Sequence, residues 1–503
     1  MIALLLFLVP LIGGLLTFLP NKSGMARSLA LGSALLSLAG VIAGLTLFKQ
    51  PLYWEFDAEW LQTLGSRFSL KGDAMGMLMS LLTSIGVLLA VLGSWNNDVQ
   101  GSNRFYGLLL WMQAGMMVVF LASDALLFYF GWELALIPAY FLCSIWGGEK
   151  RIAVTFKFFI YTFVGSVLML IGLIYLQSLT PNHSFQMQAF RNLEIPESKQ
   201  VWLFWLFFLA FAIKVPVFPF HTWQPDTYEQ SPTTVTMLLS GVMVKMGLVA
   251  MIRWMLPILG IGVFIWSDVV ICLSVIGILY ASLIAIRQDD LKRLIAYSSI
   301  AHMGLTVAAL FSLSGFSNNS NVVLQYHQVG FQGILLQLFS HGINILGMWL
   351  LADRIERRFG TRKLSELGGL ARTAPTFTIF FLLIAFANIA LPLTNAFPGE
   401  FLQFNALFHA QSPYRFVFLV LAGLGVILSA IYTLNMVRRI FFGETNQATE
   451  NGLRLSTAEC LALSLVVGLI LVFGVYPQAV LDFTNDFSRE YVKAIDITRF
   501  LAK

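Results

Sequence analysis

The hydrophobic residues of this chain are gathered in long runs, and short polar stretches separate the runs. A helix needs about 20 apolar residues to cross the hydrocarbon of a membrane. Fourteen runs are close to that length, at about 2–19, 28–48, 74–94, 105–122, 124–146, 153–177, 201–220, 232–252, 268–286, 294–311, 328–351, 374–411, 416–437 and 457–476. The pattern predicts an all-α polytopic membrane protein with about 14 transmembrane helices.

Two of the predicted spans are interrupted by proline, which breaks a helix interior. The seventh ends in VPVFP at 215–219, and the twelfth contains Pro392 and Pro398. Interrupted spans at matching places in two halves are typical of transporters built from inverted repeats. We therefore expect two inverted five-helix repeats with broken helices 7 and 12. The expected boundaries are 1–103 for helices 1–3, 104–254 for the first repeat, 255–440 for the second, and 441–503 for helix 14 and the tail.

The composition supports a membrane location. Hydrophobic residues make up 58% of the chain and charged residues only 11%, against about 25% charged in a typical globular protein. So few charges argue against a cytosolic enzyme, a nucleic-acid binder and a disordered regulator. The three cysteines form no C-x-x-C pair, and we find no P-loop or dinucleotide fingerprint. We expect no cofactor or metal in this chain, so energy for uphill transport would come from partner subunits.

The distribution of Lys and Arg predicts the orientation, because positive residues favour cytoplasmic loops. Loops that follow odd-numbered spans hold 17 of these residues, and loops that follow even-numbered spans hold 7. Adding the C-terminal tail to the second group raises it only to 11. Both termini are therefore expected on the non-cytoplasmic side.

Five ionisable residues remain inside the predicted spans: Lys157, Lys214, Lys245, Glu133 and Glu400. Each costs about 2.5–3.5 kcal/mol at the centre of a membrane helix, and such residues usually mark ion or proton pathways. Burial favours the neutral form of a group and a nearby opposite charge favours the charged form. A glutamate that gains and loses a lysine partner can therefore bind and release a proton. A static ion pair and, for Lys157 and Lys214, a side chain that reaches the interface are the structural alternatives.

Sequence neighbours give these residues further context. Lys214 precedes the VPVFP break, Lys245 lies between Gly241 and Gly247, and Glu400 follows Pro398 and Gly399. Glycines allow neighbouring helices to approach closely, and irregular backbone inside a membrane lines protein or a cavity. Two histidines inside spans ten and eleven, His302 and His341, are candidate proton relays, although a hydrogen-bonded core histidine is the alternative.

Four segments carry a resemblance to a known family. They read FGWEL at 130–134, KFFIYT at 157–162, KVPVFPFHTWQP at 214–225 and DLKRLIAYSS at 290–299. Together they resemble the antiporter-like membrane subunits of respiratory complex I, NADH:quinone oxidoreductase, over about residues 70–440. The chain has a glutamate at position 400 and ends after span fourteen. In both respects it resembles the antiporter-like subunit of intermediate length. One departure is Leu393-Thr394-Asn395, where the family usually has a small residue and glycine.

The resemblance implies a role for each residue. Glu133 and Lys214 would form a modulating ion pair, Lys245 would be the central proton carrier and Glu400 the exit-side site. His302 and His341 would belong to a hydrated axis between them, with Lys157 a further relay. NADH, FMN, Fe–S clusters and quinone would be bound by partner subunits. Expected partners are the other membrane-arm subunits, above all two antiporter-like neighbours, and lipids, in a bacterial inner membrane.

Three other assignments stay open at this point. Subunits of multi-subunit Na⁺/H⁺ antiporters share the motifs around Glu133 and Lys214, and membrane-bound hydrogenases have related arms. A scaffold subunit that only holds its neighbours together is the third, and the five charges within the spans argue against it.

Overall fold

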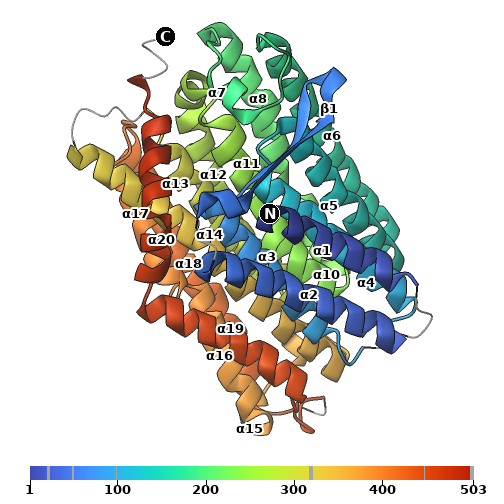
Figure 1. Cartoon of the computed structure of the whole chain (residues 1–503). Coiled ribbons are helices and arrows are strands. Elements are labelled where there is room, and N and C mark those ends of the chain that lie inside the picture. The colour runs from blue at the N-terminus through green and yellow to red at the C-terminus, as the bar shows by residue number, and fades with distance from the viewer. Residues whose placement is uncertain (20–22, 48–49, 98, 316–320, 447, 499–503) are drawn as a thin grey trace. The chain divides into compact units, whose positions relative to one another are not determined.

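The computed structural model describes residues 1–19, 23–47, 50–97, 99–315, 321–446 and 448–498. These ranges are almost entirely helical, with one short pair of strands (Figure 1). The chain forms two compact units. Unit 1 comprises Met1–Val215, Gln230–Trp266 and Ala494–Lys503, and unit 2 comprises Pro216–Glu229 and Ser267–Lys493.

Unit 1 contains the N-terminal helices and a central helical run. Its elements are α1 (Ile2–Thr17), α2 (Ser23–Thr46), η1 (Pro51–Trp54), β1 (Glu55–Leu61), η2 (Gln62–Leu64), β2 (Ser66–Lys71), α3 (Ala74–Gly93), α4 (Ser102–Leu121), α5 (Ala125–Trp146), α6 (Arg151–Leu179), α7 (Met187–Arg191), α8 (Glu197–Lys214), α10 (Thr233–Leu238), η3 (Leu239–Met243), α11 (Val244–Ala250) and η4 (Met251–Met255). The last four join into one span, in which η3 and η4 are π-helical turns. All of its most apolar window is buried, so this span forms the centre of the unit.

Unit 2 contains the second half of the chain. Its elements are α9 (Trp223–Gln230), all but the last residue, α12 (Gly260–Arg287), which starts in unit 1, α13 (Leu291–Ser312), α14 (Asn321–Phe359), η5 (Leu364–Glu366), α15 (Leu370–Thr373), α16 (Pro375–Asn388), α17 (Ala396–Phe408), α18 (Arg415–Phe441), α19 (Thr457–Val475) and α20 (Gln478–Ala494). Helices α13 and α14 are 94% buried over their most apolar windows, whereas α18 and α19 are 33% and 22% buried. The first two therefore form the core of the unit and the last two its exterior.

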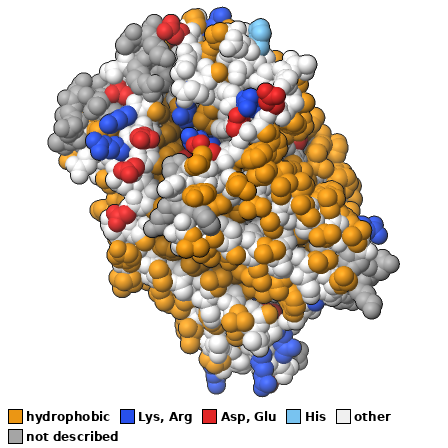
Figure 2. Space-filling view, in the orientation of Figure 1, with side chains coloured by type: hydrophobic (Ala, Val, Ile, Leu, Met, Phe, Trp, Pro, Cys, Tyr) orange, Lys and Arg blue, Asp and Glu red, His pale blue; other side chains and the backbone are white. Residues whose placement is uncertain are grey.

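The predicted spans are confirmed as helices. Eleven helices in the described part of the chain are long and apolar enough to cross a membrane, and α1 and α16 are shorter apolar helices. The seventh predicted span is α8, and the twelfth is divided between α16 and α17, as the prolines indicated. Hydrophobic side chains cover much of the face in Figure 2. The chain is thus a multi-pass membrane protein, while the inverted-repeat boundaries stay a prediction.

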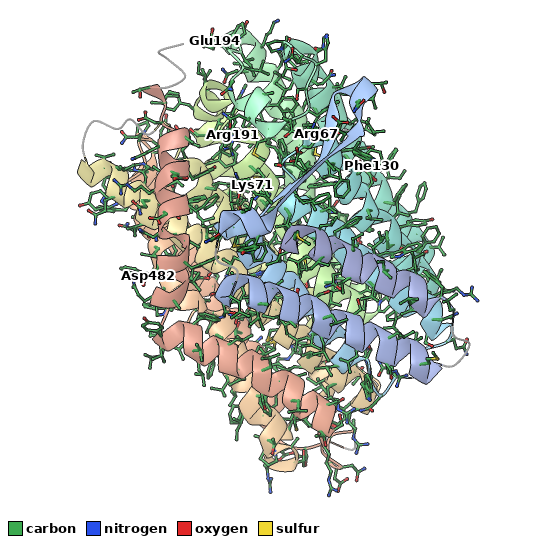
Figure 3. All side chains as sticks on the ribbon, viewed as in Figure 1. Arg67, Lys71, Phe130, Arg191, Glu194 and Asp482 are labelled. Carbon is green, nitrogen blue, oxygen red and sulfur yellow. The ribbon has the colours of Figure 1, made fainter. Side chains whose placement is uncertain are left out.

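An antiparallel hairpin is the main element that the hydrophobic pattern missed. Strands β1 and β2 pair from Glu55 with Lys71 onward, and the Trp60 ring lies 5.1 Å from the ring of Phe130 on α5. Arg67 and Lys71 mark β2 in Figure 3. Each strand is only six or seven residues long and lies between two spans, so its alternation is too short to predict a strand.

One buried carboxylate, that of Asp124, ties the hairpin to the start of α5. It accepts hydrogen bonds from Ser66 Oγ at 2.8 Å, from the Arg67 N–H at 3.0 Å and from the α5 N–H groups of Leu126 and Leu127. Burial raises the pKa of Asp124 above its usual value, although these hydrogen bonds act in the opposite direction. Asp124 thus serves as both the helix cap and the attachment point of the hairpin.

Candidate functional site

Lys214 is the last residue of α8, and its side chain is only 2% exposed. A positive charge is favoured at the C-terminal end of a helix, where carbonyl groups lack partners. The ammonium nitrogen lies 5.2 Å from the centre of the Trp132 ring on α5, a cation–π contact. Among the described residues, this nitrogen has no hydrogen-bond partner. Lys214 is therefore held inside unit 1 by a ring and a helix end rather than by a carboxylate.

Glu133 follows Trp132 directly on α5. Its side chain is half-buried, and the charge of Glu133 acts on Lys214. One carboxylate oxygen, Oε1, is buried without a hydrogen-bond partner among the described residues. The structure thus brings the two predicted partners within electrostatic range but does not hydrogen-bond them.

Close helix packing positions this part of α5. A Cβ atom on Gly131 would lie 2.7 Å from Val118 Cγ1 on α4, and one on Gly115 of α4 would lie 2.3 Å from the Ala135 backbone nitrogen. Only glycine fits at both positions. The two helices therefore approach closely on either side of Glu133.

Lys245 lies at the centre of unit 1 and is fully buried on α11. Its ammonium group donates a hydrogen bond of 2.8 Å to the Ser240 carbonyl oxygen in the π-turn η3. A π-turn leaves a carbonyl outside the regular helical ladder, and such turns are frequent at functional sites. The turn therefore supplies the acceptor that a buried ammonium group needs.

Gly247 brings Lys245 close to the end of α8. A Cβ atom on Gly247 would lie 3.2 Å from Lys214 Cβ and 2.5 Å from Val215 Cγ2. The expectation that a glycine beside Lys245 allows close helix approach is thus confirmed at this position. Lys157 is half-buried on α6, in the second turn of that helix. A relay role for Lys157 stays a prediction.

Unit 2 brings together Glu400, His302 and Gln337. The three side chains are at most 7% exposed. Glu400 Oε1 lies 2.9 Å from His302 Nδ1 and accepts a hydrogen bond of 3.3 Å from Gln337 Nε2. Because an ionised carboxylate only accepts hydrogen bonds, His302 donates through Nδ1 when Glu400 is charged. The predicted Glu400 and His302 are therefore direct partners.

His341 extends this cluster. Its ring centre lies 5.9 Å from that of His302, and its Nε2 atom lies 3.3 Å from Ser299 Oγ. His302 and Glu400 also line a cavity of about 20 Å³ with Ser429 of α18. That volume is enough for one or two water molecules. The arrangement can pass a proton between a carboxylate, two imidazoles and water.

The break in the twelfth span is held open by side chains of α14. Asn344 Nδ2 donates to the Ala387 carbonyl oxygen at 3.0 Å, and Ser340 Oγ donates to the Asn395 carbonyl oxygen at 2.9 Å. Leu393, at the departure from the usual family sequence, has a φ of +73°. This left-handed conformation favours glycine. The departure from the usual family sequence thus places a leucine in a strained backbone conformation.

The DLKR segment at 290–293 organises one end of unit 2. Asp290 caps α13 by accepting from the Arg293 N–H at 3.0 Å. Arg293 forms ion pairs with Asp226 at 3.1 Å and Glu229 at 2.8 Å, both on α9. Arg362 also pairs with Glu229, at 2.8 Å. This motif therefore has a structural role at the end of the helix, apart from the buried acids and bases.

Trp132 and Gln337 are site residues that the sequence reasoning missed. Trp132 lies in the FGWEL motif, but the motif alone predicts no contact with Lys214. Gln337 lies four residues before His341, so the two share a face of α14. An amide side chain one helical turn from a candidate relay histidine is the sequence signal that could have indicated Gln337.

Comparisons with known proteins show the family of this chain. Residues 122–429 match the family described as NADH:quinone oxidoreductase/Mrp antiporter, TM. NADH-quinone oxidoreductase subunit M of Escherichia coli K12 is 32% identical, over 98% of this chain and 99% of that protein. The Rickettsia prowazekii subunit M is 35% identical, over 84% of this chain and 83% of that protein.

A solved structure supports the same assignment. A chain in respiratory complex I from Thermus thermophilus with bound NADH has a TM-score of 0.88 and 28% identity, covering 98% of this chain and 100% of that one. The expectation drawn from the four motifs is therefore confirmed. The chain belongs to the antiporter-like, proton-translocating membrane subunits of NADH:quinone oxidoreductase, respiratory complex I.

Proposed function

We propose that Glu133, Lys214, Lys245 and Glu400 are the residues that carry protons through this subunit. Protons are taken up from the cytoplasm toward Lys214 and Lys245 in unit 1, and they are released to the far side from Glu400 in unit 2. His302, His341 and Lys157 relay protons within their own units. The direct contact between Glu400 and His302 supports this role in unit 2.

The buried amine of Lys214 carries most of the proposal. Among the described residues this amine has no hydrogen-bond partner. It lies against the ring of Trp132, although the residue that follows Trp132 is the carboxylate Glu133. At an effective dielectric constant of about 20, bringing opposite charges from about 8 Å to about 4 Å gains about 2 kcal/mol. That energy changes a proton affinity by about 30-fold. Opening and closing the Glu133–Lys214 pair is thus sufficient to switch proton binding.

Our proposals for cofactors, partners and location rest on the resemblance to the family and on the composition. Among the described residues, no group of three His, Cys, Asp or Glu side chains could hold a metal ion. We place NADH, FMN, the Fe–S clusters and quinone in partner subunits, and two antiporter-like subunits as direct neighbours. We place the chain in a bacterial inner membrane with both termini on the non-cytoplasmic side.

The test is Glu133→Gln in the purified whole complex, reconstituted in liposomes. Glu149→Gln is the matched control, because Glu149 is an exposed loop residue before α6. We expect both variants to assemble, and only Glu133→Gln to lose most of the protons moved per NADH oxidised. A Glu133→Gln complex that pumps at the wild-type ratio would contradict the modulating role of the pair.

A further inference from the structure

Two histidines lie at the far ends of the helices that hold Glu400 and Gln337. Helices α14 and α17 run antiparallel, since Gly399 is close to Gln337, Gly333 to Leu402 and Gly330 to Ala406. Continuing this pairing beyond Gly330 leads to His327 on α14 and to His409, which caps the end of α17. Nine residues of helix, about 13 Å, separate Glu400 from His409.

Both histidines have their Nδ1 atom fixed by a helix carbonyl. His327 Nδ1 lies 3.0 Å from the Val323 carbonyl oxygen, and His409 Nδ1 lies 2.9 Å from that of Asn405. A carbonyl oxygen only accepts, so each ring donates through Nδ1 and Nε2 is the basic nitrogen of the neutral ring. Each ring can therefore take up and release a proton at Nε2 without losing its bond to the helix.

The pair reaches from the protein interior to its surface. His327 is 3% exposed, whereas His409 is half-buried and stacks on Tyr326, whose side chain is 40% exposed, with ring centres 3.9 Å apart. The charge of His409 acts on His327, so the two rings lie within electrostatic range. The predicted orientation puts the start of α14 on the non-cytoplasmic side.

Polar groups lead from Glu400 part of the way to these rings. One turn along α17, the fully buried Gln403 donates to Thr306 Oγ1 at 3.3 Å. The Oε1 atoms of Gln403 and Gln337 are buried without hydrogen-bond partners among the described residues. Buried amide oxygens of this kind are usually satisfied by ordered water. Beyond Gln403, the contact of Gly330 with Ala406 closes the space between the helices.

From this placement we infer that His327 and His409 form the proton-release station of unit 2. The inference rests on the function proposed for Glu400. A proton leaves the Glu400 carboxyl group and passes through water at Gln403 to Nε2 of a histidine ring. The imidazolium ion then loses its Nε2 proton to water at the surface. The Gly330–Ala406 contact is the barrier that must open for each transfer, and it prevents a return path while closed.

The helix that packs beside this part of α14 also carries charged groups. Helix α20 packs on α14 through a hydrogen bond from Gln328 to Asn485, and it carries Asp482 and Asp486. Asp482 accepts from Gln478, and Asp486 accepts from Asn485. Both carboxylates thus have hydrogen-bond partners on α20 itself.

The experiment uses the whole complex in liposomes with its NADH site outside, so that protons are released into a lumen of preset pH between about 5.5 and 8.5. Wild-type pumping should depend on lumenal pH through a single midpoint within this range. His327→Gln and His409→Gln should each slow pumping by about three-fold or more and abolish that midpoint. His183→Gln, at an exposed loop histidine of unit 1, is the matched control.

The outcomes separate this inference from the function on which it rests. If Glu400→Gln stops pumping while both histidine variants keep the wild-type lumenal pH profile, the release station is wrong and the role of Glu400 stands. If Glu400→Gln pumps normally, the role of Glu400 is wrong. If the buried His327→Gln does not assemble, the half-exposed His409→Gln decides the matter.

Discussion

Gly247→Ala tests whether the spacing between Lys245 and Lys214 matters for pumping. The added Cβ atom would lie 2.5 Å from Val215 Cγ2, 2.9 Å from the Phe211 carbonyl oxygen and 3.2 Å from Lys214 Cβ. Carbon atoms pack favourably at about 3.5–4.0 Å. The substitution must therefore move α11 away from the end of α8 by about 1 Å.

The expected effect on stability is modest and the expected effect on pumping is large. Overpacking a buried contact costs about 1–3 kcal/mol, and alanine in place of glycine within a helix returns about 1 kcal/mol. A net loss of at most about 2 kcal/mol leaves assembly intact. Displacement of a positioned group by about 1 Å, in contrast, can slow a reaction by about 100-fold. Fewer protons should move per NADH oxidised.

Reconstituted complex provides the assay, with NADH oxidation and lumenal acidification followed together. Gly423→Ala on α18 is the control, because a Cβ atom there meets no other atom within 4 Å. Both variants should contain the full set of subunits. The reasoning is refuted if Gly247→Ala matches Gly423→Ala in protons moved per NADH.

Three further substitutions test other parts of the structure. Leu393→Gly should raise the midpoint of thermal inactivation, because it removes about 1–2 kcal/mol of left-handed strain, and an unchanged or lower midpoint contradicts this. Glu229→Gln weakens ion pairs to Arg293 and Arg362, so it should cost about 1–3 kcal/mol, measured as earlier proteolysis around α9 on heating. Asp124→Asn should speed hydrogen exchange in β2, because the amide group cannot accept all the hydrogen bonds that the carboxylate accepts. Because burial raises the pKa of Asp124, the wild type has extra stability below the unfolded pKa and loses it as pH rises through the folded pKa, whereas asparagine does not titrate; the difference in exchange rate should therefore be largest at acidic pH and shrink toward neutral pH, and a difference that grows with pH would contradict this.

The sequence was sufficient for the spans and for the buried charges. A run of about 20 apolar residues forms a helix in a membrane, because only a helix satisfies its backbone hydrogen bonds there. A lysine or glutamate inside such a run costs several kcal/mol of insertion free energy and therefore indicates function. The break at Pro392 was predictable for the same local reason.

The partners of those charges were not predictable. Gln337 and Glu400 are 63 residues apart, and only the packing of α14 against α17 brings them together. The π-turn that supplies an acceptor to Lys245 has the composition of an ordinary helix. The hairpin is fixed by Asp124, a contact across 58 residues from Ser66. Long-range pairing of this kind leaves no periodic signal.

The contact between Lys214 and Trp132 has a spectroscopic consequence. An indole changes its absorption and emission when a full charge appears or disappears beside its ring, and the Lys214 nitrogen lies 5.2 Å from the ring centre. Loss of the Lys214 proton, or movement of the amine toward Glu133, would therefore alter the optical spectrum of Trp132. The difference between wild-type and Trp132→Phe spectra isolates that signal from the other eleven tryptophans among the twelve of the chain. Trp132 is in this sense a built-in reporter of the charge on the neighbouring lysine during turnover.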